Sequence, residues 1–214
     1  MIRADLQIEG KGRLGRQWTS EHGNLYTTLL LPSEANLQVI PQLGFVVALA
    51  AYDTVKKVVS PKLKWPNDCL VDGAKIAGVL CEVVSQNPVS VALGCGINIA
   101  HAPGGLAYPA TCLSRYSSTT VEQTYLTYAE NLKRWLAIWN NGQSFPHIRQ
   151  AWVARAIGIG EEVILISQAQ THRGTMVGID ASGALVLSDA NGNRVAHRAG
   201  DLTIPSLTKL RERI

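Results

Sequence analysis

The 214-residue sequence lacks a long hydrophobic run, a C-x-x-C pair and a strong excess of one charge. Its longest apolar stretch, Leu43 to Tyr52, is far shorter than the roughly 20 residues that cross a bilayer, so no membrane partner is expected. The N-terminus has no apolar signal core, which indicates a cytoplasmic protein. The four cysteines are widely spaced and favour reduced, buried thiols over a zinc ribbon. A net charge of +4 argues against a dedicated nucleic-acid coat.

Hydrophobic residues make up 46% of the chain, which is enough to bury a core of ordinary domain size. The order of strands and helices before residue 157 predicts an α+β unit, 1–157. After it, short strands between tight glycine turns predict a small SH3-like β-barrel, 158–214. The expected strands span 6–9, 24–31, 62–65, 75–84, 89–100, 163–166, 174–179, 184–188 and 194–197. The expected helices span 41–59, 121–140 and 148–155.

Two local signals refine these helices. The first helix should begin at Pro41 and turn Asp53 toward solvent, since Asp53 falls on its polar side. The second should begin with a capping box, formed either by Thr119 with Glu122 or by Thr120 with Gln123, and should end at Asn141-Gly142.

A glycine-rich, cationic loop follows the first expected strand. Its pattern, Gly10-x-Gly12-x-x-Gly15, matches the dinucleotide fingerprint formally, but no helix pattern starts inside it, as that fingerprint requires. Glycines let a backbone approach a ligand, and arginine makes forked contacts with carboxylates and phosphates. The loop therefore favours contact with an anionic ligand over a solvated turn. Its cations and the aromatic residue that follows are Lys11, Arg13, Arg16 and Trp18.

Three further segments place polar or small residues unusually, although each alone fits an ordinary structural role. Lys64 lies at a strand end that Pro66 terminates, so its ammonium group faces either a cleft or solvent. Gly78 interrupts an apolar strand, which marks close approach of another group or tight packing beneath a helix. Asn98 is an amide within an apolar run and needs a backbone or ligand partner.

The succession of these segments is more specific than any one of them. The chain resembles the biotin–protein ligases in having, in order, Gly-Lys-Gly-Arg-Leu-Gly-Arg-Gln-Trp, Lys-Trp-Pro-Asn-Asp, Lys-Ile-Ala-Gly-Val-Leu-x-Glu and Gly-x-Gly-Ile-Asn. The resemblance, to the monofunctional type without a DNA-binding domain, runs from about residue 4 to the C-terminus. It implies an α+β fold: a mixed-sheet catalytic domain of the biotin/lipoate ligase type, followed by an SH3-like β-barrel.

The resemblance also implies an activity. A biotin ligase uses ATP with Mg²⁺ to activate biotin as biotinyl-5′-AMP, and transfers biotin to a lysine of a biotin carboxyl carrier protein or domain, as in acetyl-CoA carboxylase. Two anions must meet in the first step, so nearby cations should carry much of the catalysis.

Site residues follow from the same resemblance. Lys64, which would touch the biotin carboxylate and the α-phosphate, and Arg13, in the loop that covers the acyl-adenylate, are the predicted catalytic residues. The predicted biotin-binding residues are Gln7, Lys11, Gly12, Arg13, Lys64 and Gly78. The predicted nucleotide-binding residues are Arg13, Arg16, Trp18 and Asn98. The resemblance assigns no Mg²⁺ ligand.

The chain departs from the family pattern near its beginning. Family members carry a strand and a Ser/Thr-Thr-Asn helix start that help to wrap biotin, whereas nine residues precede Gly10 here and none match. We therefore expect an incomplete biotin pocket and poor biotin binding. The family usually has arginine where Lys11 stands. The helix-turn-helix of repressor-type ligases has no counterpart, so no DNA binding is expected, and a homodimer is compatible with the sequence.

Two alternative functions stay open at this point. A lipoate or octanoyl ligase or transferase would share the catalytic fold and would also modify a carrier lysine. A non-enzymatic nucleic-acid-binding module would use the basic loop and the small barrel, although aromatic residues make up only 6% of the chain.

Overall fold

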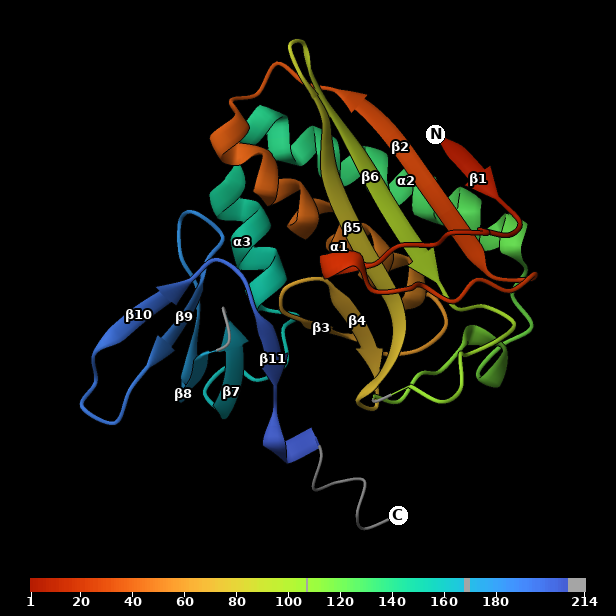
Figure 1. Cartoon of the computed structure of the whole chain (residues 1–214). Coiled ribbons are helices and arrows are strands. Elements are labelled where there is room, and N and C mark those ends of the chain that lie inside the picture. Colours follow the sequence, from red (N-terminus) through yellow and green to blue (C-terminus); the bar gives the residue numbers. More distant parts are fainter. Residues whose placement is uncertain (107, 168–169, 208–214) are drawn as a thin grey trace.

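The computed structural model describes residues 1–106, 108–167 and 170–207, so residues 208–214 of the second predicted unit lie outside the described part. A six-stranded sheet in the order β1-β2-β6-β5-β4-β3 forms its centre (Figure 1). The strands are β1 (Ile2–Ala4), β2 (Leu25–Pro32), β3 (Lys62–Lys64), β4 (Asp68–Val71), β5 (Ala74–Gln86) and β6 (Val89–Ile97). These strands pair antiparallel, while parallel bridges from Leu63 to Ala156 and from Lys75 to Ala110 make the sheet mixed, as predicted.

Helices cover one face of this sheet, and the N-terminal segment crosses the other face (Figure 1). The α-helices are α1 (Leu43–Val55), α2 (Val121–Trp139) and α3 (Phe145–Val153). Short 3₁₀ helices are η1 (Arg13–Gly15), η2 (Leu37–Gln42), η3 (Leu113–Arg115) and η4 (Asn140–Gly142). Alternate side chains of the two long central strands point toward the helices and are buried, because the period of a strand is two. The opposite face of β5 and β6 is left for a ligand site.

The helical stretch Leu37–Val55 is long and apolar enough to cross a membrane by length and composition alone. Its most apolar window, however, is 67% buried inside the molecule. Helix α1 packs against the sheet and against α2 and α3, so burial in the core accounts for its apolar composition.

The helix boundaries confirm one local prediction and correct another. Thr120 and Gln123 form the capping box of α2, with both reciprocal hydrogen bonds present, and the helix ends where Asn140 takes a left-handed conformation. The first helix is shorter than predicted, because Pro41 lies inside the 3₁₀ turn and α1 begins only at Leu43.

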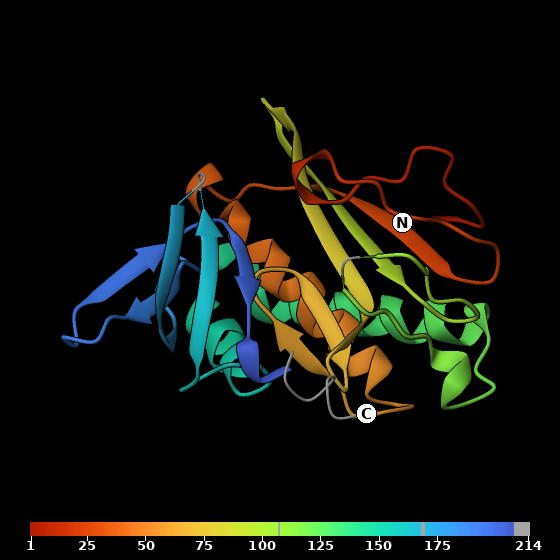
Figure 2. The ribbon, with the colours of Figure 1, turned by 60° about the horizontal axis from the view of Figure 1, so that its bottom comes forward.

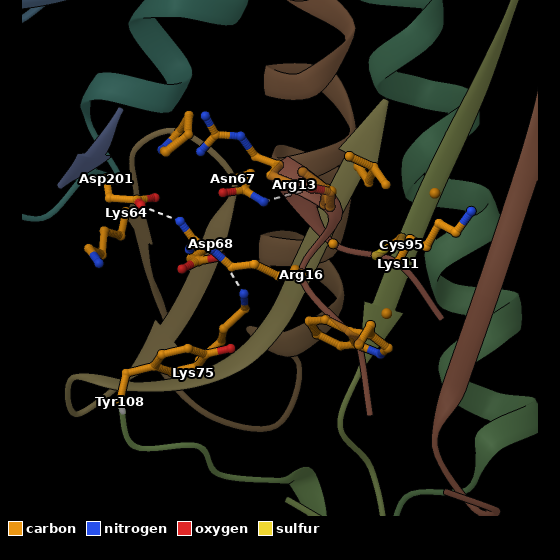
Figure 3. Close-up of a pocket in the computed structure, with 18 of the residues that line it drawn as sticks. Lys11, Arg13, Arg16, Lys64, Asn67, Asp68, Lys75, Cys95, Tyr108 and Asp201 are labelled. Atoms are coloured by element: carbon orange, nitrogen blue, oxygen red, sulfur yellow. Dashed lines mark hydrogen bonds and ion pairs between the residues drawn. The ribbon is translucent and has the colours of Figure 1, made fainter. Parts of the chain in front are cut away.

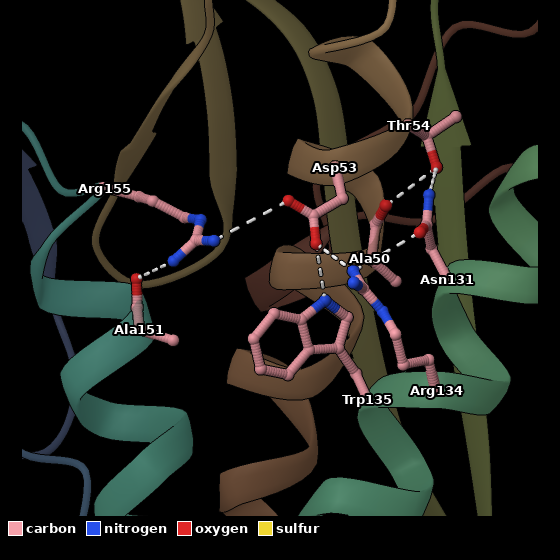
Figure 4. A network of polar contacts seen from close by, with 8 residues as sticks. All are labelled: Ala50, Asp53, Thr54, Asn131, Arg134, Trp135, Ala151 and Arg155. Atoms are coloured by element: carbon pink, nitrogen blue, oxygen red, sulfur yellow. Dashed lines mark hydrogen bonds and ion pairs between the residues drawn. The ribbon is translucent and has the colours of Figure 1, made fainter.

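Asp53 does not face solvent as predicted, since its side chain is only 14% exposed. Its carboxylate accepts a hydrogen bond from Trp135 Nε1 at 2.8 Å and pairs with Arg134, and Arg155 Nη2 lies 3.9 Å away (Figure 4). Arg155 in turn accepts, through its backbone carbonyl, a 3.0 Å hydrogen bond from the Leu63 N–H in β3. The Asp53 carboxylate therefore links α1 to α2 and, through Arg155, to the segment that borders β3, the strand of Lys64.

The C-terminal unit is a five-stranded antiparallel sheet in the order β10-β9-β8-β7-β11, and it lies at one end of the molecule (Figure 2). Its strands are β7 (Glu162–Ser167), β8 (Gln170–Ile179), β9 (Leu185–Ser188), β10 (Arg194–His197) and β11 (Asp201–Thr203). The meander agrees with the predicted SH3-like unit, although among the described strands the sheet stays open between β10 and β11. Its buried side chains continue the core of the larger sheet.

Three strand predictions need correction. The N-terminal strand is Ile2–Ala4, and residues 6–9 are irregular, because their side chains are exposed and gain nothing from pairing. Strands β4 and β11 were not predicted, since four and three residues are too few to show a period. A tight turn at Asp72-Gly73, with both residues at positive φ, joins β4 to β5.

Candidate active site

A cavity of about 740 Å³ lies on the sheet face opposite the helices. Its floor is built from alternate residues of the two long central strands, and its roof is the glycine-arginine loop, residues 10–16 (Figure 3). One wall comes from β11 of the C-terminal sheet. The predicted site residues that line it are Gln7, Lys11, Gly12, Arg13, Arg16, Trp18, Lys64 and Gly78. The structure thus brings together residues separated by more than 70 positions in the sequence.

The glycine-arginine loop folds back on itself instead of starting a helix. Gly12 N donates to the Arg16 carbonyl at 2.7 Å, and Lys11 and Gln17 form an antiparallel bridge. At the tip, Leu14 and Gly15 have φ values of 57° and 72°, in the left-handed region. No dinucleotide-type helix follows, in agreement with the sequence analysis. The tight return leaves the two arginine side chains projecting from the loop.

Trp18 lies against the cavity floor. A Cβ atom built on Gly78 would meet Trp18 Cζ3 at 2.8 Å, and one on Gly96 would meet Cζ2 at 2.7 Å. Both positions therefore require glycine, because no larger side chain fits beneath the indole. Trp18 Nε1 is buried and has no hydrogen-bond partner among the described residues. The indole thus lines the cavity as an aromatic ring, while its N–H stays buried against the sheet.

Lys75 is a site residue to which sequence analysis gave no role. Its Nζ lies 2.7 Å from Asp68 Oδ1, and it sits 5.1 Å from the Trp18 ring centroid and 5.4 Å from that of Tyr108. Its side chain is 13% exposed, so the ammonium group is held by a carboxylate and two ring faces in a largely desolvated place. The signal was available, since Lys75 opens the Lys-Ile-Ala-Gly segment and Asp68 closes Lys-Trp-Pro-Asn-Asp.

Lys64 stands at the end of β3, on the strand's cavity-facing side. Leu63 and Trp65 are buried at 0% and 2% exposure and fix the strand, while Lys64 is half-buried and lines the cavity. In register, Lys64 faces Asp68 of β4. Lys62, two residues earlier, is exposed and does not line the cavity. Exposure therefore alternates along this strand, with Leu63 and Trp65 buried between and beside the more exposed lysines.

Arg13 and Gln7 approach the cavity from the roof. Arg13 Nη1 donates to the Gly200 carbonyl at 3.4 Å, and burial, which outweighs the opposing effect of Asp201, lowers the pKa of its guanidinium. Gln7 lies in the irregular segment before the loop, and its side-chain carbonyl accepts a 3.0 Å hydrogen bond from Ser20 Oγ. Arg16 is paired with Asp201, a residue for which the sequence gave no signal.

Asn98 lies apart from the main cavity. Its amide group donates to the Thr111 carbonyl at 3.0 Å and to the Lys75 carbonyl at 3.4 Å, and the residue is 2% exposed. It lines a much smaller pocket on the far side of Trp18. Its position ties the start of β5 to the segment before η3, so its described contacts are structural.

Charges of both signs line the cavity. Its five cations share the lining with four carboxylates, Glu9, Asp68, Glu82 and Asp201, and two of the cations are paired, Lys75 with Asp68 and Arg16 with Asp201. Cations gathered at a concave site favour transition states in which negative charges approach each other. The lining cations are Lys11, Arg13, Arg16, Lys64 and Lys75.

Fold and site together define a class: an α+β protein that binds anionic ligands between an open sheet face and a cationic glycine loop. Comparison with known proteins identifies a family within this class. Residues 2–98 match the Biotin/lipoate A/B protein ligase family, and residues 158–202 match the Biotin protein ligase C terminal domain.

Relatives and a solved structure cover nearly the whole chain. The chain is 36% identical to a biotin--[acetyl-CoA-carboxylase] ligase of Paracoccus denitrificans, over 91% of this chain and 86% of that protein. It is 31% identical to a bifunctional ligase/repressor of Bacillus spizizenii, over 93% of this chain and 64% of that protein. A biotin protein ligase from Aquifex aeolicus, in complex with biotin and ATP, superposes with a TM-score of 0.82 at 26% identity, covering 94% of this chain and 88% of that one. The chain belongs to the biotin protein ligase family.

Proposed function

We propose that this chain is an ATP-dependent biotin–protein ligase, which activates biotin as biotinyl-5′-AMP and transfers it to a lysine of a biotin carboxyl carrier protein. The observation that carries the proposal is the convergence of five cations on one sheet-floored cavity beneath a glycine loop. The curated relative of Paracoccus and the biotin- and ATP-bound structure of Aquifex support the same reaction.

The first half-reaction joins two anions. A carboxylate oxygen of biotin attacks the α-phosphorus of ATP, the bond to the bridging oxygen breaks, and pyrophosphate leaves. Lys64 and Arg13 both line the cavity and would offset the negative charge that gathers between the two reactants. Lys11, Gly12, Gly78 and Gln7 complete the proposed biotin side, where Gln7 offers both an amide donor and an acceptor for a ureido ring.

The second half-reaction transfers the acyl group. The amine of the acceptor lysine attacks the acyl carbonyl, the mixed anhydride breaks, and AMP leaves with the electron pair. A loop that covers the anhydride protects it from water before the carrier arrives. Arg16, Trp18 and Asn98 form the proposed nucleotide side, with Trp18 as a stacking surface and Asn98 acting through the Lys75 segment, whose backbone carbonyl it binds.

The described residues do not present a metal site. No group of three or more His, Cys, Asp or Glu side chains that could hold an ion occurs among them, and the two cavity aspartates are paired with cations. No Mg²⁺ ligand is therefore assigned among the described residues. The expectation that Mg²⁺ accompanies ATP rests on the family alone.

The proposal also covers the compartment, the acceptor protein and the domain boundary. We propose the cytoplasm as the compartment and the carrier domain of acetyl-CoA carboxylase as the acceptor, in line with the name of the Paracoccus relative. A domain boundary at residue 157 is supported by the separate five-stranded sheet and by a family match that begins at residue 158. A homodimer and the lack of DNA binding stay predictions.

The decisive test is biotin-dependent exchange of pyrophosphate into ATP by the purified chain. Exchange with biotin, but not with lipoate or octanoate, would support the proposal. Exchange with lipoate or octanoate alone would instead support a lipoate or octanoyl ligase of the same fold, an activity compatible with the match to the Biotin/lipoate A/B protein ligase family. Salt-dependent RNA binding without any exchange would instead favour the nucleic-acid-binding module.

A further inference from the structure

We propose that Asp201, on the C-terminal sheet, is a positioning residue that holds the two arginines of the glycine-arginine loop over the cavity. Its carboxylate pairs with Arg16, and the carbonyl of the preceding Gly200 accepts a hydrogen bond from Arg13 Nη1 at 3.4 Å (Figure 3). Two adjacent residues of one strand edge thus hold two cations of a loop that lies more than 180 positions earlier in the chain.

The anchor itself is rigid. Asp201 and the next residue pair with Ile166 and Leu165 of β7, and Leu202 is only 3% exposed. A Cβ atom on Gly200 would meet Leu165 Cδ1 at 2.6 Å and the Ile166 carbonyl at 2.8 Å, so this backbone is packed tightly against β7. A carboxylate fixed on such a strand can dictate the position of a flexible partner.

The loop is the flexible partner. It has three glycines, and its own backbone contacts close only its base and tip, which leaves the long arginine side chains without support from inside the loop. Arg16 is near enough to disfavour the charge of Arg13, whereas Asp201 favours it. Without this carboxylate, like-charge repulsion would turn the two side chains away from each other and into solvent.

The pair is partly exposed, with side-chain exposures of 55% for Arg16 and 46% for Asp201, so its effect should be modest. Exposed ion pairs of this kind change an equilibrium by about two- to fivefold. Such a contact is strong enough to bias the loop and weak enough to let the arginines adjust to phosphates. It gives the C-terminal sheet a direct role in the site, because Leu202, Thr203 and Ile204 line the cavity beside it.

The first test reads the loop directly. Trypsin should cut wild type slowly after Arg13 and Arg16, and Asp201→Asn should raise the cutting rate there about two- to fivefold, while Asp201→Glu restores it. Glu162→Gln is the matched control, since it removes an exposed carboxylate of the same sheet that forms no ion pair among the described residues. Equal cutting in wild type and Asp201→Asn would overturn the proposal.

The second test is kinetic and rests on the proposed function. In pyrophosphate exchange, Asp201→Asn should lower kcat/KM for ATP about two- to fivefold, and Asp201→Glu should recover the wild-type value. An unchanged kcat/KM in folded Asp201→Asn would overturn the positioning role. Absence of exchange in wild type would count against the proposed function alone, because proteolysis would still report on the loop. Asp201→Ser serves as a second variant if Asp201→Asn does not fold, judged by its melting temperature.

Discussion

Gly78 of β5 faces Gly96 of β6 across the sheet, and the Trp18 indole lies against both of them. The pair forms a shallow seat in the cavity floor that no other residue type would leave open. The sequence marked Gly78 as a place of close approach, with tight packing beneath a helix as the alternative. The structure shows that the approaching group is an aromatic side chain of the chain itself.

Gly96→Ala should therefore displace Trp18. The added methyl group would lie 2.7 Å from Trp18 Cζ2, which no rotation of a methyl group can relieve. We expect KM for ATP to rise about tenfold, corresponding to ~1.4 kcal/mol of overpacking, with a smaller change for biotin. Gly104→Ala is the matched control, because a Cβ there meets nothing within 4 Å. If both variants have the wild-type KM for ATP, Trp18 does not form the nucleotide side.

The parts of the fold that the sequence predicted are those with local signals. The capping box at Thr120, for example, depends on two residues that are three positions apart. Strand β11 has three residues and becomes a strand only because β7 pairs with it. A pattern of so few residues carries no period, so tertiary contact decides it.

The site residues divide in the same way, into those that stand out in the sequence and those that only the fold brings to the cavity. The loop cations and Lys64 stand out through residue type and spacing, and the structure places them around one cavity. Asp201 could not be predicted, because its role arises from contact with a loop that is distant in sequence. Asn98 shows the limit of a local pattern: a lone polar residue in an apolar run needs a backbone or ligand partner, and only the fold shows that two backbone carbonyls accept from its amide.

Lys64→Gln should reduce the rate of pyrophosphate exchange by about 10²–10³, the usual loss when one electrostatic stabiliser is removed from a catalytic site. The fold should be unaffected, because Leu63 and Trp65 carry the buried packing of this strand. Lys62→Gln is the control, since it removes the same charge from the same strand at an exposed position outside the cavity. Similar exchange rates for both folded variants would remove Lys64 from the catalytic machinery.

Asp53→Ala should destabilise the whole chain. It removes the acceptor of the Trp135 indole N–H and the counter-charge of Arg134 and Arg155 (Figure 4). Leaving a buried donor and a half-buried cation without this partner costs about 1–3 kcal/mol of unfolding free energy. Urea unfolding should show this loss, whereas Glu130→Ala, an exposed site on α2, should stay within about 0.5 kcal/mol of wild type. A loss below that limit for Asp53→Ala would mean that the network contributes nothing to stability.

The thiol of Cys95 should make the protein sensitive to alkali. Burial in the sheet raises the pKa of Cys95 from its ordinary 9.0 to about 12, and the residue is 3% exposed. Above pH 9 the unfolded chain releases this proton while the folded chain keeps it, so the unfolded state binds fewer protons and stability falls as pH rises. Between pH 9 and about 12 this one group contributes a slope of about −1.4 kcal/mol per pH unit.

Cys95→Ala isolates that contribution. Its cavity lowers the unfolding free energy by an amount that does not depend on pH, so the diagnostic quantity is the difference in slope between variant and wild type. Urea unfolding from pH 7.5 to 10.5 should give two curves that run parallel below pH 9 and converge above it, since only wild type loses the stabilising effect of the protonated thiol. Groups remote from Cys95 titrate alike in both proteins and cancel in the difference. Cys69, Cys81 and Tyr128, whose pKa values burial raises and Cys95 raises further, add to the wild-type loss in the same direction. Curves that stay parallel throughout would show that the Cys95 thiol ionises in the folded protein as readily as in the unfolded chain.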